Sequence, residues 1–236
     1  MDGNGRWAQR RGLSRIEGHK RGKDAVRAVV ETSREIGLEY LTLYAFSTEN
    51  WQRPAGEVRA LMSILHRYLR TELQRMMKKN LRLRAIGDLS RLPTAVRHAL
   101  EKAVWTTRNN AGLTVALAIS YGAREELVAA ARALAIKACN GQLDPQEIDD
   151  HCLTQHLWTA DIPDPDLLIR TSGEFRLSNF LLWQLAYTEI YVTDTLWPDF
   201  DREEFLRALA DYQSRERRFG RTTEQQTSAE LKRAAR

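Results

Sequence analysis

The sequence has few of the features that mark secreted, fibrous or membrane-spanning proteins. It holds only two cysteines in 236 residues, Cys139 and Cys152, too few for a disulfide framework. Its longest apolar runs are about five residues, far short of the roughly 20 that a membrane-spanning helix needs. No secretory signal, internal repeat or Pro-, Gly- or Ser-rich linker is present. These absences favour a single domain over residues 1–236 that works in the cytoplasm.

Lysine is also scarce, because only seven of the 36 basic residues are Lys and the rest are Arg. Residues 1–27 carry eight basic and three acidic side chains, whereas the rest of the chain is balanced. Arginine offers a planar fork for phosphate, so this bias indicates phosphate recognition, with a solvated basic surface as the alternative. A nucleic-acid-binding module would also explain the basic start, but no recognition motif follows, and we expect no nucleic acid partner.

The pattern of apolar residues predicts alternating helices and strands. Helices are expected over 22–37, 55–78, 93–108, 123–138, 145–158 and 202–215. Strands are expected over 40–46, 81–86, 113–119, 167–170 and 190–192. This order predicts an α/β fold with a mainly parallel central sheet covered by helices on both faces. The chemistry of such folds collects beyond the carboxyl ends of the strands, here residues 47–53, 87–88, 120–122 and 171–178.

Polar motifs stand at the start of the chain and at two of these strand ends. Residues 2–8 read DGNGRWA, in which a carboxylate, backbone amides and an Arg could hold a magnesium diphosphate. The spacing also fits a dinucleotide fingerprint, but the preceding strand that this fingerprint requires is absent. Residues 46–54 read FSTENWQRP, where a capped loop is the alternative to a site. Arg170, Arg176 and Ser178 could wrap a second diphosphate, and Glu189 adds a second carboxylate.

Together these motifs closely resemble the cis-prenyltransferase family. The matching segments are DGNGRWA at 2–8, GHKRG at 18–22, LYAFSTENWQRP at 43–54, IRTSGEFRLSNFLLWQLAYTE at 169–189, WPDF at 197–200 and RERRFG at 215–220. The resemblance implies Mg²⁺-dependent, repeated cis-condensation of isopentenyl diphosphate onto farnesyl diphosphate. The expected product is a long polyprenyl diphosphate, most of all undecaprenyl diphosphate for the cell-wall lipid carrier. A short- or medium-chain synthase and an inactive truncated form or partner subunit are the alternatives.

The resemblance also implies a role for each matching residue. Asp2, Asn50 and Ser47 are the implied catalytic residues, and Asp2 and Glu189 the implied magnesium ligands. The implied site for the allylic diphosphate comprises Gly3, Asn4, Gly5, Arg6, Arg15 and His19. The implied site for isopentenyl diphosphate comprises Arg170, Arg176, Leu177 and Ser178. Further implied substrate contacts come from Trp7, Ser47, Thr48, Glu49, Trp51 and Arg53.

The resemblance carries further expectations and two departures. An apolar tunnel is expected between the helices over 22–37 and 55–78 and the sheet, together with a homodimer and delivery of the product to the inner face of the membrane. Phe175 stands where some relatives carry a metal-approaching His. Relatives also carry a strand directly before residue 2, which this sequence would lack. Residues 221–236 are expected to form a flexible tail.

Overall fold

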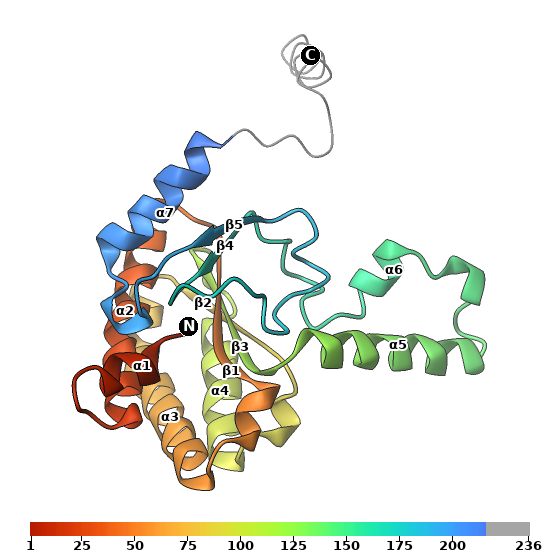
Figure 1. The fold of residues 1–236 in the computed structure, drawn as a ribbon. Helices are drawn as coiled ribbons and strands as arrows, with labels where there is room; N and C mark the ends of the chain where they lie inside the picture. The colour runs from red at the N-terminus through yellow and green to blue at the C-terminus, as the bar shows by residue number, and fades with distance from the viewer. Residues whose placement is uncertain (216–236) are drawn as a thin grey trace.

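A computed structural model describes residues 1–215 and shows helices and strands in alternation (Figure 1). The expected tail, 221–236, lies outside the described residues. The helices are α1 (Asn4–Gln9), α2 (Arg15–Glu35), α3 (Ala55–Lys78), α4 (Thr94–Thr107), α5 (Ala123–Cys139), α6 (Asp150–Thr154) and α7 (Arg202–Ser214). The strands are β1 (Tyr40–Ser47), β2 (Arg82–Ile86), β3 (Thr114–Tyr121), β4 (Leu167–Arg170) and β5 (Glu189–Val192). Short 3₁₀ turns are η1 (Thr48–Gln52), η2 (Leu89–Arg91), η3 (Pro145–Glu147) and η4 (Trp197–Asp199).

The described strands form two parallel sheets, which confirms the predicted fold class. The larger sheet has the order β1-β3-β2, and the smaller one pairs β4 with β5. Every residue of β3 is buried. This follows from its central place, because neighbouring strands satisfy both of its edges and other segments cover both of its faces.

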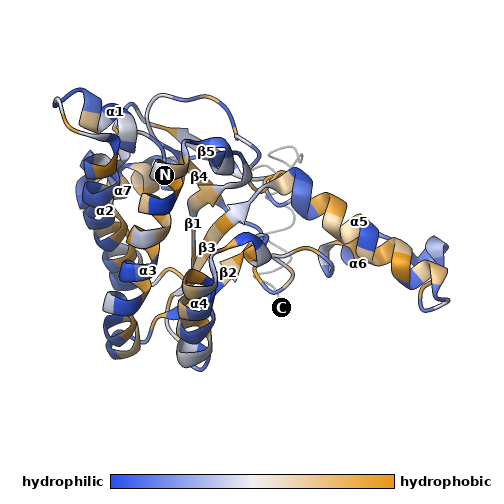
Figure 2. Cartoon of the chain, turned by 90° about the horizontal axis from the view of Figure 1, so that it is seen from below, coloured by the Kyte–Doolittle hydropathy of each residue, from blue (hydrophilic) through white to orange (hydrophobic). Residues whose placement is uncertain are grey.

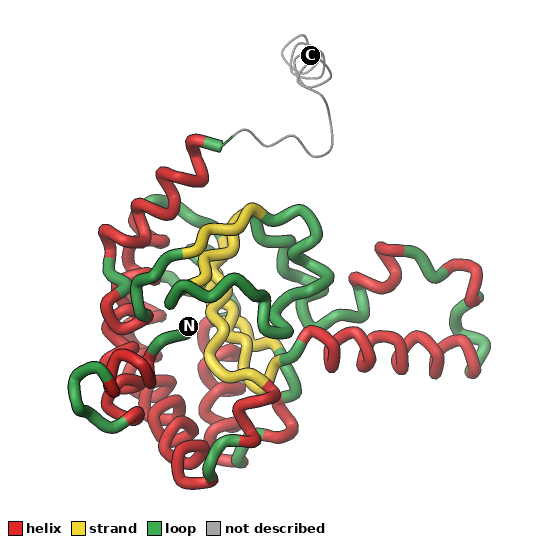
Figure 3. Tube along the Cα trace, in the orientation of Figure 1, coloured by secondary structure: helices red, strands yellow, loops and turns green. Residues whose placement is uncertain are grey.

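The two faces of the larger sheet are covered in different ways. Helices α2, α3 and α4 pack against one face, through side chains such as Val29, Leu69 and Leu100. The other face packs against Phe180 and Leu181, which belong to a long loop segment rather than to a helix (Figure 3). Coloured by hydropathy, the strands stand out as apolar beside helices with strongly polar outer surfaces (Figure 2).

Helix α5 departs from the expectation that helices would cover both faces of the sheet. It runs away from the body of the molecule with α6 beside it (Figure 1). Its buried residues are few, and Val128 and Ile136 are more than half exposed. The apolar side of this helix is mostly alanine, which offers little area for burial against a sheet.

Two predicted helices have different limits in the structure. The helix expected over 145–158 is wrong as a single helix, because η3 and α6 each begin at a separate aspartate cap. Asp144 Oδ1 accepts from the Gln146 amide, and Asp149 Oδ1 accepts from the Cys152 amide. The helix expected to begin at residue 22 already begins at Arg15.

The first residues of the chain join β1 to the end of β4. The Met1 ammonium donates to the Tyr44 carbonyl at 3.2 Å, and Thr171 Oγ1 donates to the Asp2 carbonyl at 2.9 Å. Asp2 is therefore fixed between the two sheets. That this sequence lacks a strand before residue 2 stays a prediction. None of the helices within residues 1–215 is both long and apolar enough to cross a membrane.

Candidate active site

A cavity of about 600 Å³ opens at the carboxyl ends of β1 and β4. Its mouth is polar and brings together ten of the residues expected from sequence, namely Asp2, Asn4, His19, Ser47, Glu49, Asn50, Arg53, Arg170, Arg176 and Ser178. Its body is apolar and is lined by side chains that include Val26, Leu43, Ala45, Phe46, Leu61, Met62, Ile64, Leu65 and Leu117. The cavity can therefore hold a molecule with an anionic head and a hydrocarbon body.

Asp2 is the centre of the charged mouth. Its Oδ2 lies 3.0 Å from Arg170 Nη2 and 3.4 Å from Arg6 Nη2, and its Oδ1 accepts from the Gly3 amide at 2.7 Å. Partial burial opposes its charge, but the Gly3 amide and the two guanidinium groups outweigh this and lower the pKa of Asp2. Asp2 is therefore a carboxylate at neutral pH, as metal binding requires.

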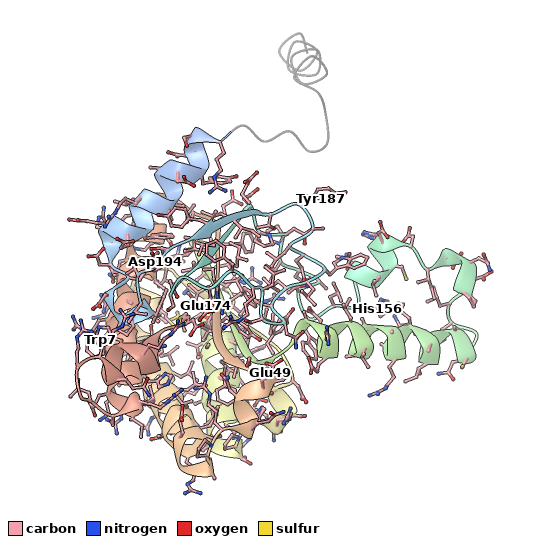
Figure 4. The ribbon with its side chains drawn as sticks, viewed as in Figure 1. Trp7, Glu49, His156, Glu174, Tyr187 and Asp194 are labelled. Carbon is pink, nitrogen blue, oxygen red and sulfur yellow. The ribbon has the colours of Figure 1, made fainter. Side chains whose placement is uncertain are left out.

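Glu174 connects the cations on the two sides of the mouth. Its Oε1 lies 2.9 Å from Arg6 Nη1, and its Oε2 lies 2.5 Å from Arg176 Nη1. Figure 4 shows Glu174 in the interior of the view, whereas Tyr187 lies at the margin and points away. A carboxylate thus occupies the space between two guanidinium groups that phosphate oxygens could also bridge.

Several polar atoms around the mouth are buried and unpaired. Within residues 1–215, no hydrogen-bond partner is found for Arg170 Nε, His19 Nε2, Ser172 Oγ, Thr48 Oγ1 or Asn4 Oδ1. Buried polar groups are normally satisfied, and leaving one unpaired costs about 1–3 kcal/mol. Their gathering at one mouth indicates a site built for a polar ligand.

The loop after β4 has an unusual backbone. Ser172, Ser178, Asn179 and Leu181 all adopt a positive φ, between 46° and 76°. Such residues cost about 1–3 kcal/mol each and persist where surrounding contacts hold them. Gly3 packs against this loop at φ 105°, and a Cβ placed there would lie 2.3 Å from Ser172 Oγ. The close approach explains why this position of the first motif needs glycine.

The end of β1 turns directly into η1 and presents Ser47 and Asn50 to the cavity. Asn50 Oδ1 accepts from the Ser47 amide at 3.2 Å, and the Ser47 side chain accepts from the Asn50 amide in return. Next to them, Glu49 Oε1 accepts from Asn179 Nδ2 at 3.0 Å. Burial opposes the charge of Glu49, but the hydrogen bonds from Asn179 and Ser47 lower its pKa. The reciprocal hydrogen bonds between Ser47 and Asn50 form a capping box, which fixes the direction of the Asn50 side-chain amide.

Glu57 lies close to three basic side chains around the mouth. Its Oε1 lies 3.0 Å from Arg53 Nη1, 3.6 Å from Arg15 Nε and 3.9 Å from His19 Nε2. Burial, together with the charge of Arg53, lowers the pKa of His19 to about 4. The imidazole is therefore neutral at pH 7, so that its Nε2 can donate to or accept from a ligand without adding charge.

Other expected site residues surround the cavity without lining it. Trp7 is buried and its Nε1 donates to Asp199 Oδ1 at 2.7 Å. Trp51 Nε1 donates to Ser120 Oγ at 3.0 Å, and its ring packs edge-on against Phe46. The Trp51 ring thus supports the wall residue Phe46, whereas Trp7 packs with Ala8 and Leu196. The remaining expected residues outside the lining are Gly3, Gly5, Arg6, Arg15, Thr48 and Leu177.

Glu189 is not brought to Asp2 within this chain. In the parallel register Glu189 pairs with Leu167, whereas Arg170 pairs with Val192. Glu189 is therefore at the amino end of the strand pair, about 10 Å from the carboxyl end, where Asp2 lies. Its Oε2 lies 3.0 Å from Arg215 Nη1. Within residues 1–215 no group of three or more His, Cys, Asp or Glu side chains could hold a metal ion. Asp2 and Glu189 do not meet within the described chain, and Glu189 as a magnesium ligand stays a prediction.

Sequence reasoning missed Lys23, Asn179, Glu57 and Glu174 as parts of the site. Lys23 follows His19 by four residues on α2, so helical spacing could have placed both on one face. Each glutamate pairs with one cation nearby in the sequence, Arg53 or Arg176, and with one that is distant, Arg15 or Arg6. No local pattern reveals the distant pairs.

Comparisons with known proteins give the family of this chain. The family described as "Putative undecaprenyl diphosphate synthase" matches residues 1–220. The isoprenyl transferase of Heliobacterium mobile is 55% identical over 93% of this chain and 85% of its own length. The isoprenyl transferase of Bacillus subtilis is 49% identical over 93% of this chain and 85% of its own length.

A solved structure extends the similarity to the fold. Lavandulyl diphosphate synthase from Lavandula x intermedia, in complex with dimethylallyl diphosphate, has a TM-score of 0.90 and 41% identity over 93% of this chain and 95% of that one. Sequence, fold and the shape of the cavity point to the same class of enzyme. The chain belongs to the undecaprenyl diphosphate synthase family of cis-prenyltransferases.

Proposed function

We propose that the protein elongates an allylic diphosphate, farnesyl diphosphate, by repeated cis-addition of isopentenyl diphosphate, to give undecaprenyl diphosphate. The observation that carries this is the cavity, because a mouth of cations and unpaired polar atoms opens into an apolar body. A growing prenyl diphosphate needs both parts at once. Undecaprenyl diphosphate as the product rests on the family description.

The mouth can be divided into two diphosphate sites. Arg170 ends β4, and Arg176 and Ser178 follow it. These three residues are proposed to hold isopentenyl diphosphate. The amides at the start of α1, with Arg6, His19 and Arg15, are proposed to hold the allylic diphosphate. Charge-assisted hydrogen bonds of this kind contribute about 1.5–3 kcal/mol each. The ion pairs of Glu174 with Arg6 and Arg176 would have to break before both guanidinium groups could bind phosphate oxygens.

The donor set fits a magnesium diphosphate. Mg²⁺ in such sites is held by one or two carboxylates together with phosphate oxygens and water. Asp2 supplies one ionised carboxylate beside the unpaired Nε of Arg170. When bound, the ion would neutralise charge on the departing diphosphate.

The reaction requires one bond to break, one to form and one proton to leave. The allylic C–O bond breaks, diphosphate departs, the isopentenyl double bond forms the new C–C bond, and a proton is then lost. Cations fixed around the mouth stabilise the leaving diphosphate more in the transition state than in the ground state. Asn50, oriented by Ser47, is proposed to guide the proton towards the bound diphosphate, because a neutral amide is itself a weak base.

A shorter product is the second candidate. The structural match to lavandulyl diphosphate synthase favours it, because that structure holds the small substrate dimethylallyl diphosphate. An inactive partner subunit is disfavoured by the presence of Asp2, Asn50 and Arg170 around one cavity. Only the product distinguishes a long-chain from a short-chain enzyme.

The deciding experiment incubates the protein with Mg²⁺, farnesyl diphosphate, excess isopentenyl diphosphate and detergent, and reads the product lengths by mass spectrometry. A series ending at undecaprenyl diphosphate supports the proposal, and a shorter series moves the enzyme to the second candidate. The matched control is Asp2→Ala, which should lose turnover and keep its far-UV circular dichroism. If the wild type gave the same product yield with and without Mg²⁺, the metal assignment would be refuted.

The protein is further proposed to act as a homodimer in the cytoplasm, at the inner face of the membrane. The exposed Val128 and Ile136 on the projecting α5 support a self-association surface. The apolar body of the cavity supports transfer of its product to lipid. Sedimentation at graded concentration, with Val128→Glu as the comparison, tests the dimer.

A further inference from the structure

A second, smaller chamber adjoins the apolar body of the cavity. This chamber measures about 40 Å³ and shares the wall residues Val26, Leu43, Tyr68 and Leu117 with the large cavity. Its other apolar walls are Val30, Met76, Leu81, Leu83 and Val115. These residues lie at the amino ends of β2 and β3 and in the second halves of α2 and α3. The chamber is thus the end of the apolar space that lies farthest from Asp2 and Arg170.

Charged side chains close this chamber between α2 and α3. Arg27 of α2 pairs with Glu72 of α3, and Glu31 of α2 pairs with Arg75 and Lys79. Arg75 Nη1 also lies 3.8 Å from Glu72 Oε2, which connects the two sets of pairs. All five residues line the chamber, and we call them the α2–α3 ion-pair ladder.

The ladder is firmly held at Glu72. The side chain of Glu72 is 7% exposed, whereas that of Arg27 is 39% exposed. A buried carboxylate needs a cation beside it, so separating this pair would leave an uncompensated charge. The hydrogen bond to Glu72 raises the pKa of Arg27, and the hydrogen bond from Lys79 lowers the pKa of Glu31. The two helices are therefore tied together at the point where the apolar lining ends.

We propose that the α2–α3 ion-pair ladder is the end wall of the hydrocarbon space and limits the length of the chain that the protein retains. This rests on the proposed function, because it assumes a growing prenyl tail in the cavity. Each methylene placed against the apolar walls gains free energy. A tail that reaches the ladder gains no further free energy, because it can advance only if the ion pairs around the buried Glu72 separate. Elongation therefore stops being favourable there.

The test measures how binding depends on chain length. Polyprenyl diphosphates of increasing length are titrated in detergent against the wild type, Glu31→Gln and Glu72→Gln. Glutamine keeps the size of the side chain and removes its charge. The control is Glu101→Gln, which breaks the 3.8 Å pair with Arg97 on α4, away from the chamber. A second readout is the length distribution of the products.

In the wild type the affinity should rise with length and then level off. In both ladder variants it should keep rising for at least one further isoprene unit, and the products should become longer. Identical length dependence in the wild type, the ladder variants and the control would overturn the proposal. If Glu72→Gln fails to fold, Glu31→Gln decides, because Glu31 is more exposed. Failure of turnover in the wild type would refute the proposed function, while the binding series would still judge the ladder.

Discussion

Removing the guanidinium of Arg170 tests the division of the mouth into two diphosphate sites. Arg170 Nη2 lies 3.0 Å from Asp2 Oδ2 and 3.3 Å from Ser178 Oγ, and its buried Nε has no partner within residues 1–215. A single lost charge-assisted hydrogen bond, about 1.5–3 kcal/mol, corresponds to about a 10- to 150-fold change. Arg170→Ala should therefore lower kcat/KM for isopentenyl diphosphate by at least about 10-fold.

The assay varies isopentenyl diphosphate at saturating farnesyl diphosphate, and then the reverse. Arg170→Lys keeps the charge without the fork, so it should recover only part of the loss. The matched control is Arg84→Ala, which removes the 2.8 Å pair with Asp161 outside the cavity. Arg170→Ala should keep its melting temperature within a few degrees, because Asp2 is partly exposed and retains Arg6. Equal losses for both substrates would refute the assignment of Arg170 to one of them.

Three further predictions concern stability and are measured by urea unfolding. Gly3→Ala should be destabilised by more than about 2 kcal/mol, because its Cβ would meet a serine oxygen at 2.3 Å, whereas Gly12→Ala, with φ 67° and no close neighbour, should lose only about 1–2 kcal/mol. Equal losses would contradict this explanation. Folding lowers the pKa of His19 from 6.5 to about 4, so the neutral imidazole contributes to the free energy of unfolding in full above pH 6.5, and this contribution is lost as the pH falls towards 4. His19→Gln should therefore lose about 3 kcal/mol less stability than the wild type on acidification, and parallel plots of unfolding free energy against pH for the two proteins would rule this out. Leu100→Ala, at a fully buried site, should cost about 2–5 kcal/mol, while the 44% exposed Leu13→Ala should cost little, and a reversed order would disprove the assigned core.

The mouth combines charge with local strain. Four non-glycine residues of positive φ lie between Ser172 and Leu181, beside the unpaired Arg170 Nε and Ser172 Oγ. Strain and unpaired polar atoms both cost stability, and a packed scaffold has to compensate for them. The buried β3 and the helices α2–α4 supply that scaffold. The site is therefore prepared for its ligand before the ligand binds.

Local patterns in the sequence were enough to determine much of this protein. The pattern of apolar residues predicted all five strands found within residues 1–215, because buried segments carry apolar side chains at the spacing of a strand or a helix. The rule that chemistry collects at the carboxyl ends of parallel strands placed Ser47 and Asn50, at the end of one strand, near Arg170, which ends another, and all three line one cavity with Asp2. The catalytic roles of Asp2, Ser47 and Asn50 came from the resemblance to the family, because the motif around Ser47 and Asn50 by itself also fitted a capped loop.

Only the tertiary structure decided which distant groups meet. The register of β4 and β5 separates Glu189 from Asp2, and no local spacing encodes a register between strands. The fold alone brings Arg15 to Glu57 and Arg6 to Glu174. The α2–α3 ion-pair ladder likewise depends on how two helices lie across the sheet. Periodicity shows that a helix such as α5 has an apolar side, but packing determines what covers that side. Pairings between segments are set by the whole fold, so they become visible only in three dimensions.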